Sequence, residues 1–70
     1  MKLKFDYEYI VEIRKQHNLT QTYVGKLLGY KRNTMCQKEK GISPYTLNDA
    51  FKLAELYGMK VDELFKVVSE

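Results

Sequence analysis

Apolar positions recur with helical spacing along most of the 70-residue chain, and short polar or glycine-containing stretches separate them. Val24, Leu27 and Leu28 are spaced i, i+3 and i+4, which predicts a helix with one apolar face. Thr20 precedes this segment and can cap its first turn, while Gly29 follows it and accepts the left-handed conformation common at helix ends. The pattern therefore predicts a short helix between these two residues.

A second short helix is predicted over residues 32–40, with Met35 directed to a core and Tyr30 in the turn before it. Gly25 lies inside the preceding helix at a cost of about 1 kcal/mol relative to alanine, which is best tolerated where a second backbone comes close. Two crossing helices joined by a glycine turn form a helix-turn-helix, here over residues 20–41, and indicate DNA binding. The opposite side of the second helix is the face that we expect in a major groove, and it carries Arg32, Asn33, Cys36 and Gln37.

The flanking segments predict the scaffold. Asp6 is a candidate N-cap for a helix to about His17, with Ile10 and Ile13 inside. Residues 2–5 alternate between polar and apolar, which predicts a short strand that pairs with residues 66–68.

Two further helices are expected after residue 45. Thr46 and Asp49 resemble a capping box, and Gly58 ends the helix that it starts. A last short helix is expected from Val61 to about Val67. The residues expected to point inward from the fourth helix are Leu47, Ala50, Phe51, Ala54, and Tyr57 or Leu56. The chain is thus expected to form one all-α domain of five helices over residues 1–70.

Positive charge is concentrated on the helix-turn-helix. The chain has 12 basic and 9 acidic residues, a net charge of +3. Residues 14–40 carry seven basic groups and one acid, which gives +6, whereas residues 1–13 and 41–70 carry −1 and −2. Such a block suits the neutralisation of DNA phosphates, although a run of charge is often only a solvated surface.

Composition argues against several other classes of protein. No apolar run approaches a membrane span, and the charged N-terminus does not resemble a signal peptide, so a cytoplasmic location is expected. One cysteine and one histidine make neither an intrachain disulfide nor a closed zinc site, and we expect no metal and no cofactor. No nucleophile–base motif or glycine-rich phosphate loop is present, so we do not expect an enzyme. A domain of this size has little net stability, and dimerisation would add to it.

The chain resembles the phage repressor and Cro type of helix-turn-helix protein, often called Xre-like, from about residue 10 to residue 65. The residues that carry the resemblance are Ile13-Arg14, Leu19-Thr20-Gln21, Gly25, Leu28-Gly29, Met35, Glu39, Gly41, Leu47, Leu53-Ala54, Gly58 and Val61-Asp62-Glu63-Leu64-Phe65. Their order and spacing together are specific, whereas a single short motif among them would be weak evidence. The resemblance implies a compact, lambda-repressor-like domain.

The resemblance also implies roles for individual residues. Arg32 and Gln37 match base-reading positions, since arginine can span guanine O6 and N7 and glutamine can span adenine N6 and N7. Asn33 lies beside Arg32 and can read adenine or hold a phosphate. Cys36 lies beside Gln37, where its thiol can touch a thymine methyl or can be only a half-buried small residue. The candidate phosphate contacts are Gln21, Lys31, Thr34, Lys38, Lys40, Tyr45 and Thr46. The same comparison implies an ion pair between Arg14 and Glu39. Leu64, Phe65 and Val68 exceed what so small a core needs, and we expect them in a dimer contact.

Two residues depart from the family pattern. Lys38 stands where a large apolar or aromatic residue is usual, and we expect its stem over Met35 and its ammonium group in solvent or on a phosphate. Lys31 replaces the usual serine or threonine cap, so the second helix lacks a side-chain acceptor at its start. A phosphate oxygen can take that place.

These features predict a sequence-specific regulator of transcription that binds double-stranded DNA, most simply a repressor that acts as a homodimer on an inverted repeat. The domain leaves no obvious pocket for a small-molecule effector. The alternative is a helix-turn-helix that acts mainly on a protein partner, as an antitoxin or anti-repressor does.

Overall fold

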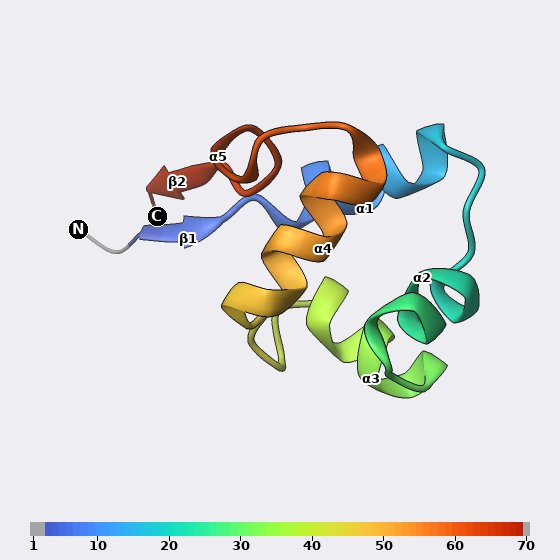
Figure 1. Cartoon of the computed structure of the whole chain (residues 1–70). Coiled ribbons are helices and arrows are strands. Elements are labelled where there is room, and N and C mark those ends of the chain that lie inside the picture. The colour runs from blue at the N-terminus through green and yellow to red at the C-terminus, as the bar shows by residue number, and fades with distance from the viewer. Residues whose placement is uncertain (1–2, 70) are drawn as a thin grey trace.

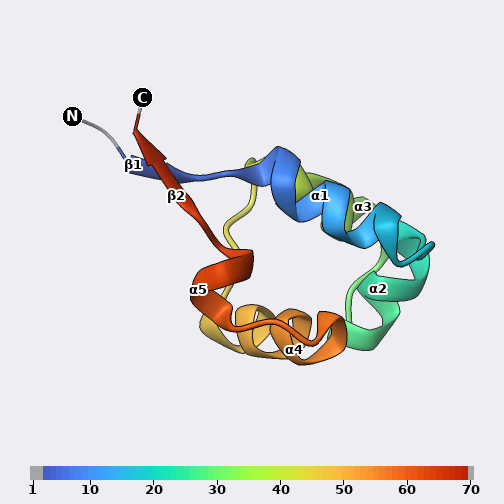
Figure 2. The same cartoon turned by 90° about the horizontal axis from the view of Figure 1, so that it is seen from above.

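The computed structural model describes residues 3–69. In chain order its elements are β1 (Leu3–Phe5), α1 (Tyr7–Gln16), α2 (Gln21–Leu28), α3 (Arg32–Glu39), α4 (Leu47–Tyr57), α5 (Val61–Leu64) and β2 (Val67–Ser69). The two strands lie at one end of the molecule, and α2 lies at the other (Figures 1 and 2). The predicted helical domain with a helix-turn-helix at α2 and α3 is confirmed.

Side chains cap the helices where the sequence indicated. Asp6 accepts a hydrogen bond from the Tyr9 amide at the start of α1, and Thr20 accepts one from the Tyr23 amide at the start of α2, both at 3.1 Å. Thr46 begins α4 in a capping box. Gly29 ends α2 in the left-handed conformation with φ of 86°, which a residue with a Cβ adopts only at a cost.

The strand pairing at the two chain ends is also confirmed. β1 and β2 are antiparallel, with Lys4 opposite Val68 and Phe5 opposite Val67. The amide of Asp6 donates to the carbonyl of Lys66 at 2.9 Å and extends this pairing toward α1. The last helix is therefore shorter than expected: it ends at Leu64, because the residues after it turn into β2.

The core fills the space between the helices. Its most buried members come from five different helices: Ile10, Val24, Met35, Leu53 and Leu64. A Cβ on Gly25 would lie 3.1 Å from the carbonyl oxygen of Tyr30 and 3.3 Å from the Cβ of Met35. The glycine therefore allows the turn and α3 to come close to α2, as its position predicted.

Three residues expected in the core lie at the surface. Leu27, Leu47 and Phe51 are 46%, 71% and 58% exposed. The inward stripe of α4 is rotated from the expected one, and it consists of Ala50, Leu53, Ala54 and Tyr57 at i, i+3, i+4 and i+7. The expected stripe with Leu47 and Phe51 and the observed stripe both fit helical spacing, so spacing alone did not choose between them.

The expected dimer contact through Leu64 and Phe65 is wrong. Leu64 has no exposed surface and Phe65 is 6% exposed. The Phe65 ring meets the Phe5 ring edge-on with centroids 5.3 Å apart, and the Tyr45 ring at 5.1 Å. β1 and the loop before α4 thus add apolar surface that the two residues cover. Val68 lies on β2 and is partly exposed.

Candidate nucleic-acid interface

The outer face of α3 presents polar side chains to solvent. Arg32, Asn33 and Gln37 are exposed and Cys36 is half-buried, whereas Met35 is buried on the opposite side. Within residues 3–69, none of the three exposed side chains is used in an internal hydrogen bond or ion pair. The structure therefore brings the four expected base-reading residues to one face, and three of them are free to contact a ligand.

The start of α3 is open. Lys31 is the N-cap residue and makes no side-chain capping bond, as expected from its identity. By contrast, side chains cap the starts of α1, α2 and α4. The first backbone N–H groups of a helix have no intrahelical partner and carry the positive end of the helix dipole. An anion placed at the start of α3 would satisfy them.

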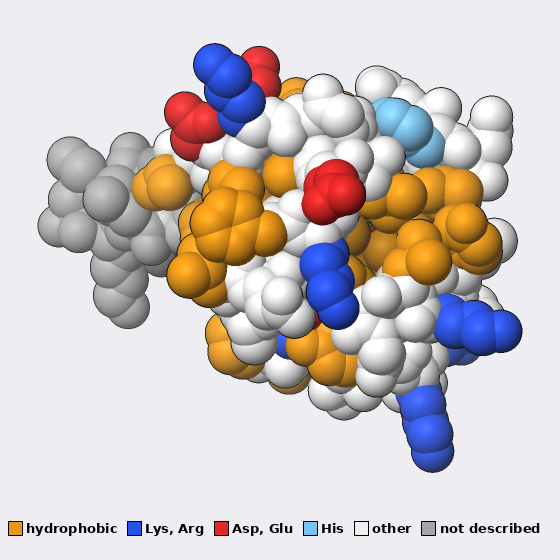
Figure 3. All heavy atoms as spheres, in the orientation of Figure 1, with side chains coloured by type: hydrophobic (Ala, Val, Ile, Leu, Met, Phe, Trp, Pro, Cys, Tyr) orange, Lys and Arg blue, Asp and Glu red, His pale blue; other side chains and the backbone are white. Residues whose placement is uncertain are grey.

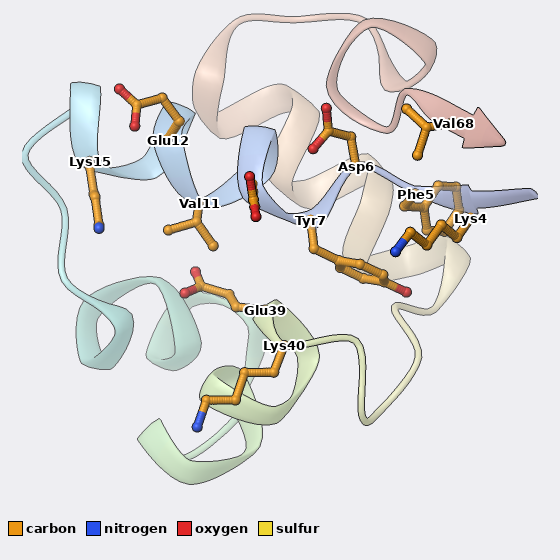
Figure 4. A pocket seen from close by; sticks show the side chains of 11 residues that line it. Lys4, Phe5, Asp6, Tyr7, Val11, Glu12, Lys15, Glu39, Lys40 and Val68 are labelled. Carbon is orange, nitrogen blue, oxygen red and sulfur yellow. The ribbon is translucent and has the colours of Figure 1, made fainter. Parts of the chain in front are cut away.

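The expected ion pair between Arg14 and Glu39 is present and joins α1 to the end of α3. The Nε of Arg14 donates to Oε2 of Glu39 at 2.7 Å, and a terminal nitrogen donates to Oε1 at 3.2 Å. Another nitrogen of Arg14 donates to the carbonyl of Leu19 at 2.7 Å. The Glu39 carboxylate points toward α1 in Figure 4. Both side chains are buried, so the pair belongs to the scaffold.

Gln21 also takes part in this cluster. Its amide nitrogen donates to Oε1 of Glu39 at 2.9 Å, a contact that the sequence did not predict. The side chain remains half-exposed at the start of α2. Gln21 therefore connects the first residue of α2 to the last residue of α3, and its remaining amide groups can still reach a phosphate.

Lys38 does not fit the expectation of a phosphate contact. The residue is 4% exposed, and its Nζ donates to Oδ2 of Asp49 at 2.8 Å and to the carbonyl of Pro44 at 2.7 Å. The ammonium group also lies 4.6 Å from the centre of the Tyr30 ring. A lysine can be buried when an acid and a carbonyl satisfy it, and here the acid lies eleven residues further along the chain.

Tyr45 is likewise wrong as a phosphate contact. Its hydroxyl oxygen is buried without a hydrogen-bond partner, and its ring stacks on the Tyr7 ring and meets Phe65 edge-on. Burial, together with the neighbouring Glu39 carboxylate, raises the pKa of this hydroxyl far above its usual range. Thr46, the next residue, stays exposed at the start of α4.

The buried polar group around Asp49 was missed at the level of sequence. The acid was expected only as part of a capping box, and it does accept from the Thr46 amide at 2.9 Å. It also accepts from the Tyr30 hydroxyl at 2.7 Å. Burial alone would raise the pKa of Asp49, but hydrogen bonds from Lys38, the Thr46 amide and Tyr30 lower it below the usual carboxyl value.

Fewer basic side chains are exposed in residues 14–40 than the sequence contains, but the exposed ones are still grouped. Two of the seven basic residues between 14 and 40, Arg14 and Lys38, are buried. The other five are exposed: Lys15, Lys26, Lys31, Arg32 and Lys40. On the face seen in Figure 3, basic side chains protrude at the lower right, over α2 and α3. The outer face of α3 is therefore bordered by cations.

A shallow groove of about 700 Å³ runs beside α1 and the end of α3 (Figure 4). It mixes both signs of charge: its lining includes Asp6, Glu8, Glu12, Glu39, Lys4, Lys15 and Lys40. Four carboxylates make this groove a poor binding place for a polyanion. Among residues 3–69, no three His, Cys, Asp or Glu side chains gather where they could hold a metal, and no helix is long and apolar enough to cross a membrane.

Known proteins share this arrangement. A family model described as helix-turn-helix matches residues 10–64. An uncharacterised helix-turn-helix-type transcriptional regulator of Methanocaldococcus jannaschii is 42% identical over 52 residues, 74% of this chain and 79% of the relative. A second such protein, from Archaeoglobus fulgidus, is 34% identical over 56 residues, 80% of this chain and 79% of the relative.

A solved structure shares the fold. The crystal structure of a transcriptional regulator from Listeria innocua superimposes with a TM-score of 0.83 at 22% identity. The match covers 96% of this chain and 64% of that protein, so the chain spans somewhat less than two thirds of its length. Sequence, fold and family model agree, and the chain belongs to the helix-turn-helix family of the Cro and Xre type.

Proposed function

We propose that the protein is a regulator of transcription that binds double-stranded DNA in a sequence-specific way, with α3 in the major groove. The observation that carries the proposal is the outer face of α3, where Arg32, Asn33 and Gln37 are exposed without internal partners beside an uncapped helix start. The archaeal relatives are named as transcriptional regulators, which supports the same conclusion. Prokaryotic regulators meet DNA in the cytoplasm, and we infer that location.

Base reading requires side chains with matched donor and acceptor pairs. Arg32 can donate twice to guanine, and Gln37 can donate to and accept from adenine. Asn33 lies next to Arg32 and can read adenine or hold a phosphate. The half-buried Cys36 thiol is small enough to touch a thymine methyl between them. Two or three such contacts within one groove define a half-site of a few base pairs.

Phosphate contacts fix the register of the protein on the duplex without reading sequence. The proposed set is smaller than the expected one, since Lys38 and the hydroxyl of Tyr45 are buried. It consists of Gln21, Lys31, Thr34, Lys40 and Thr46. Lys31 and Lys40 lie just before and just after α3, and Gln21 and Thr46 lie at the starts of α2 and α4. Contacts from these positions would meet the phosphates along the edges of the groove that holds α3.

We infer that the protein acts as a homodimer on an inverted repeat and represses transcription by occupying it. A two-fold symmetry axis would place the α3 helices of the two subunits in successive major grooves, about 34 Å apart. Leu47 and Phe51 on α4 and Val68 on β2 are exposed apolar side chains available to such a contact. Sedimentation equilibrium tests the association: twice the chain mass, free or on DNA, supports it, and a monomer in both states contradicts it.

A protein partner is the second candidate target. Leu47 lines a groove of about 490 Å³ that is mostly apolar, with Phe5, Ala50, Val61 and Phe65 among its walls. Exposed apolar residues beside such a groove suit protein association. In that case DNA binding would be weak and the role would be that of an antitoxin or anti-repressor.

Selection from randomised duplex DNA at near-physiological salt tests the proposal. Enrichment of an inverted repeat supports a dimeric, sequence-specific regulator, and enrichment of a single half-site supports a monomer. The absence of any enriched sequence would contradict the proposal and favour a protein partner.

A further inference from the structure

A buried ion pair connects the recognition helix to α4. Lys38, in the last turn of α3, and Asp49, in the first turn of α4, are 4% and 1% exposed. Their charged atoms are 2.8 Å apart. The ammonium group of Lys38 also donates to the Pro44 carbonyl at 2.7 Å, so the loop between the two helices is held by the same group.

The Asp49 carboxylate reaches both ends of α3. One oxygen accepts from the hydroxyl of Tyr30, which lies two residues before α3, at 2.7 Å. The other accepts from Lys38 near the far end of the helix and from the Thr46 amide at 2.9 Å. The Thr46 bond fixes the carboxylate to the start of α4. A rotation or shift of α3 against α4 would therefore break at least one of these bonds.

Directional bonds matter here because the backbone of α3 lies mainly beside α2 and α1 rather than beside α4. The apolar core also lies between α3 and α4, but apolar contact has no preferred direction and allows small rotations. The bonds from Tyr30 and Lys38 to Asp49 specify one orientation. Replacing a buried ion pair by apolar groups is often neutral or stabilising, so stability alone does not require a charged pair at this position.

We propose that Lys38 and Asp49 are positioning residues for operator reading: they fix the angle between α3 and the start of α4. This inference rests on the proposed function, because it concerns the register between base contacts from Arg32 and Gln37 and a phosphate contact from Thr46. Paired hydrogen bonds to a base edge tolerate little misalignment. Lys38 thus acts on specificity through geometry, although it does not touch DNA.

The test compares wild type with Lys38→Met/Asp49→Asn, which removes both charges while the side chains stay unbranched at Cβ and similar in size. Binding is measured on the enriched duplex and on a scrambled duplex at several salt concentrations. We expect the ratio of the two affinities to fall by about tenfold or more, the discrimination of roughly one base pair. Scrambled-duplex affinity and the salt slope should not change, because Lys38 contacts no phosphate. Lys52→Met, on an exposed lysine of α4, should leave the ratio and slope as in wild type.

Each other result has a defined meaning. An unchanged ratio in a folded double variant would overturn the inference, because the pair would then serve stability alone. A salt slope reduced by about one, with both duplexes weakened alike, would also overturn it, since Lys38 would then bind phosphate.

A milder variant provides the test if the double variant does not fold. Tyr30→Phe removes only the bond to Asp49 and should lower the ratio in the same direction by a smaller factor. If the double variant does not fold, an unchanged ratio in Tyr30→Phe overturns the inference. If wild type itself discriminates no duplex, the proposed function fails and the inference falls with it, whereas failure of the variants alone leaves the proposed function intact.

Discussion

Replacing Glu39 by alanine should strongly destabilise the fold without changing which bases the protein reads. The carboxylate accepts two hydrogen bonds from Arg14 and one from Gln21, at distances between 2.7 and 3.2 Å. Its removal leaves the buried Arg14 guanidinium with the Leu19 carbonyl as its remaining hydrogen-bond partner. Breaking one side of a buried pair in this way costs about 3 to 5 kcal/mol.

That loss is large for so small a domain. At roughly 0.05 to 0.15 kcal/mol per residue, a chain of this length has about 4 to 10 kcal/mol of total stability. Urea unfolding followed by circular dichroism measures the change. With a slope of about 1 kcal/mol per molar urea, the midpoint should fall by roughly 3 M or more, or the variant should be unfolded without urea.

A matched control separates the pair from the loss of any glutamate. Glu55→Ala removes an exposed acid of α4 and should change stability by no more than about 0.5 kcal/mol. The apolar double variant Arg14→Met/Glu39→Leu should recover most of the stability that Glu39→Ala loses, because no unpaired charge remains. A loss below about 1 kcal/mol in Glu39→Ala would refute the reasoning, since the pair would then behave like a solvated surface ion pair.

Three further predictions concern binding, acid stability and a close contact. Gln37→Ala should cost about 1 to 3 kcal/mol of binding free energy on the selected duplex and relax the preference at one or two base positions. Lys40→Ala should weaken binding to all duplexes alike and reduce the salt slope by about one. Identical behaviour of the two variants in salt titrations would remove Gln37 from base reading. The pKa of Asp49 is lower in the folded than in the unfolded protein, so on acidification the unfolded chain takes up the proton at a higher pH. The stability that this carboxylate contributes is therefore full above the unfolded carboxyl pKa of about 3.9 and is lost as the pH falls toward the folded value. Urea unfolding of Asp49→Asn should accordingly show a weaker loss of stability on acidification than wild type, and an equal loss would contradict the assigned bonds. Gly41→Ala should destabilise the fold by roughly 1 kcal/mol or more, because the residue has φ of 78° and its Cβ would lie 2.9 Å from the Tyr7 ring; an unchanged melting temperature would contradict this.

Local signals were sufficient to predict most of the elements. Thr20 and Gly29 mark the two ends of α2, and Asp6 and Thr46 mark the starts of α1 and α4, because capping depends on residues close together in sequence. Gly25 predicted the close approach of the turn for a similar reason, since few other roles suit a glycine within a helix. The strand pairing of the chain ends followed from alternation alone.

Errors arose where distant residues decide the outcome. Lys38 was expected at the surface because its partner Asp49 lies on another helix, and nothing near it in sequence indicates that partner. Phe65 was expected to be in excess because the ring of Phe5, sixty residues earlier, covers it only after the strands pair. Leu47 satisfied helical spacing yet lies outside, since the rotation of α4 about its own axis is set by packing against the rest of the core.

The most direct test of the account maps the bound duplex on the protein by nuclear magnetic resonance. Isotope-labelled protein is titrated with the selected duplex, and the amide shifts are followed. The account predicts the largest changes in α3, at Arg32, Asn33 and Gln37, and at the starts of α2 and α4, with little change in β1 and β2. Changes confined to the apolar groove beside Leu47, or no changes with a duplex in excess, would contradict the assignment of α3 as the DNA-reading helix.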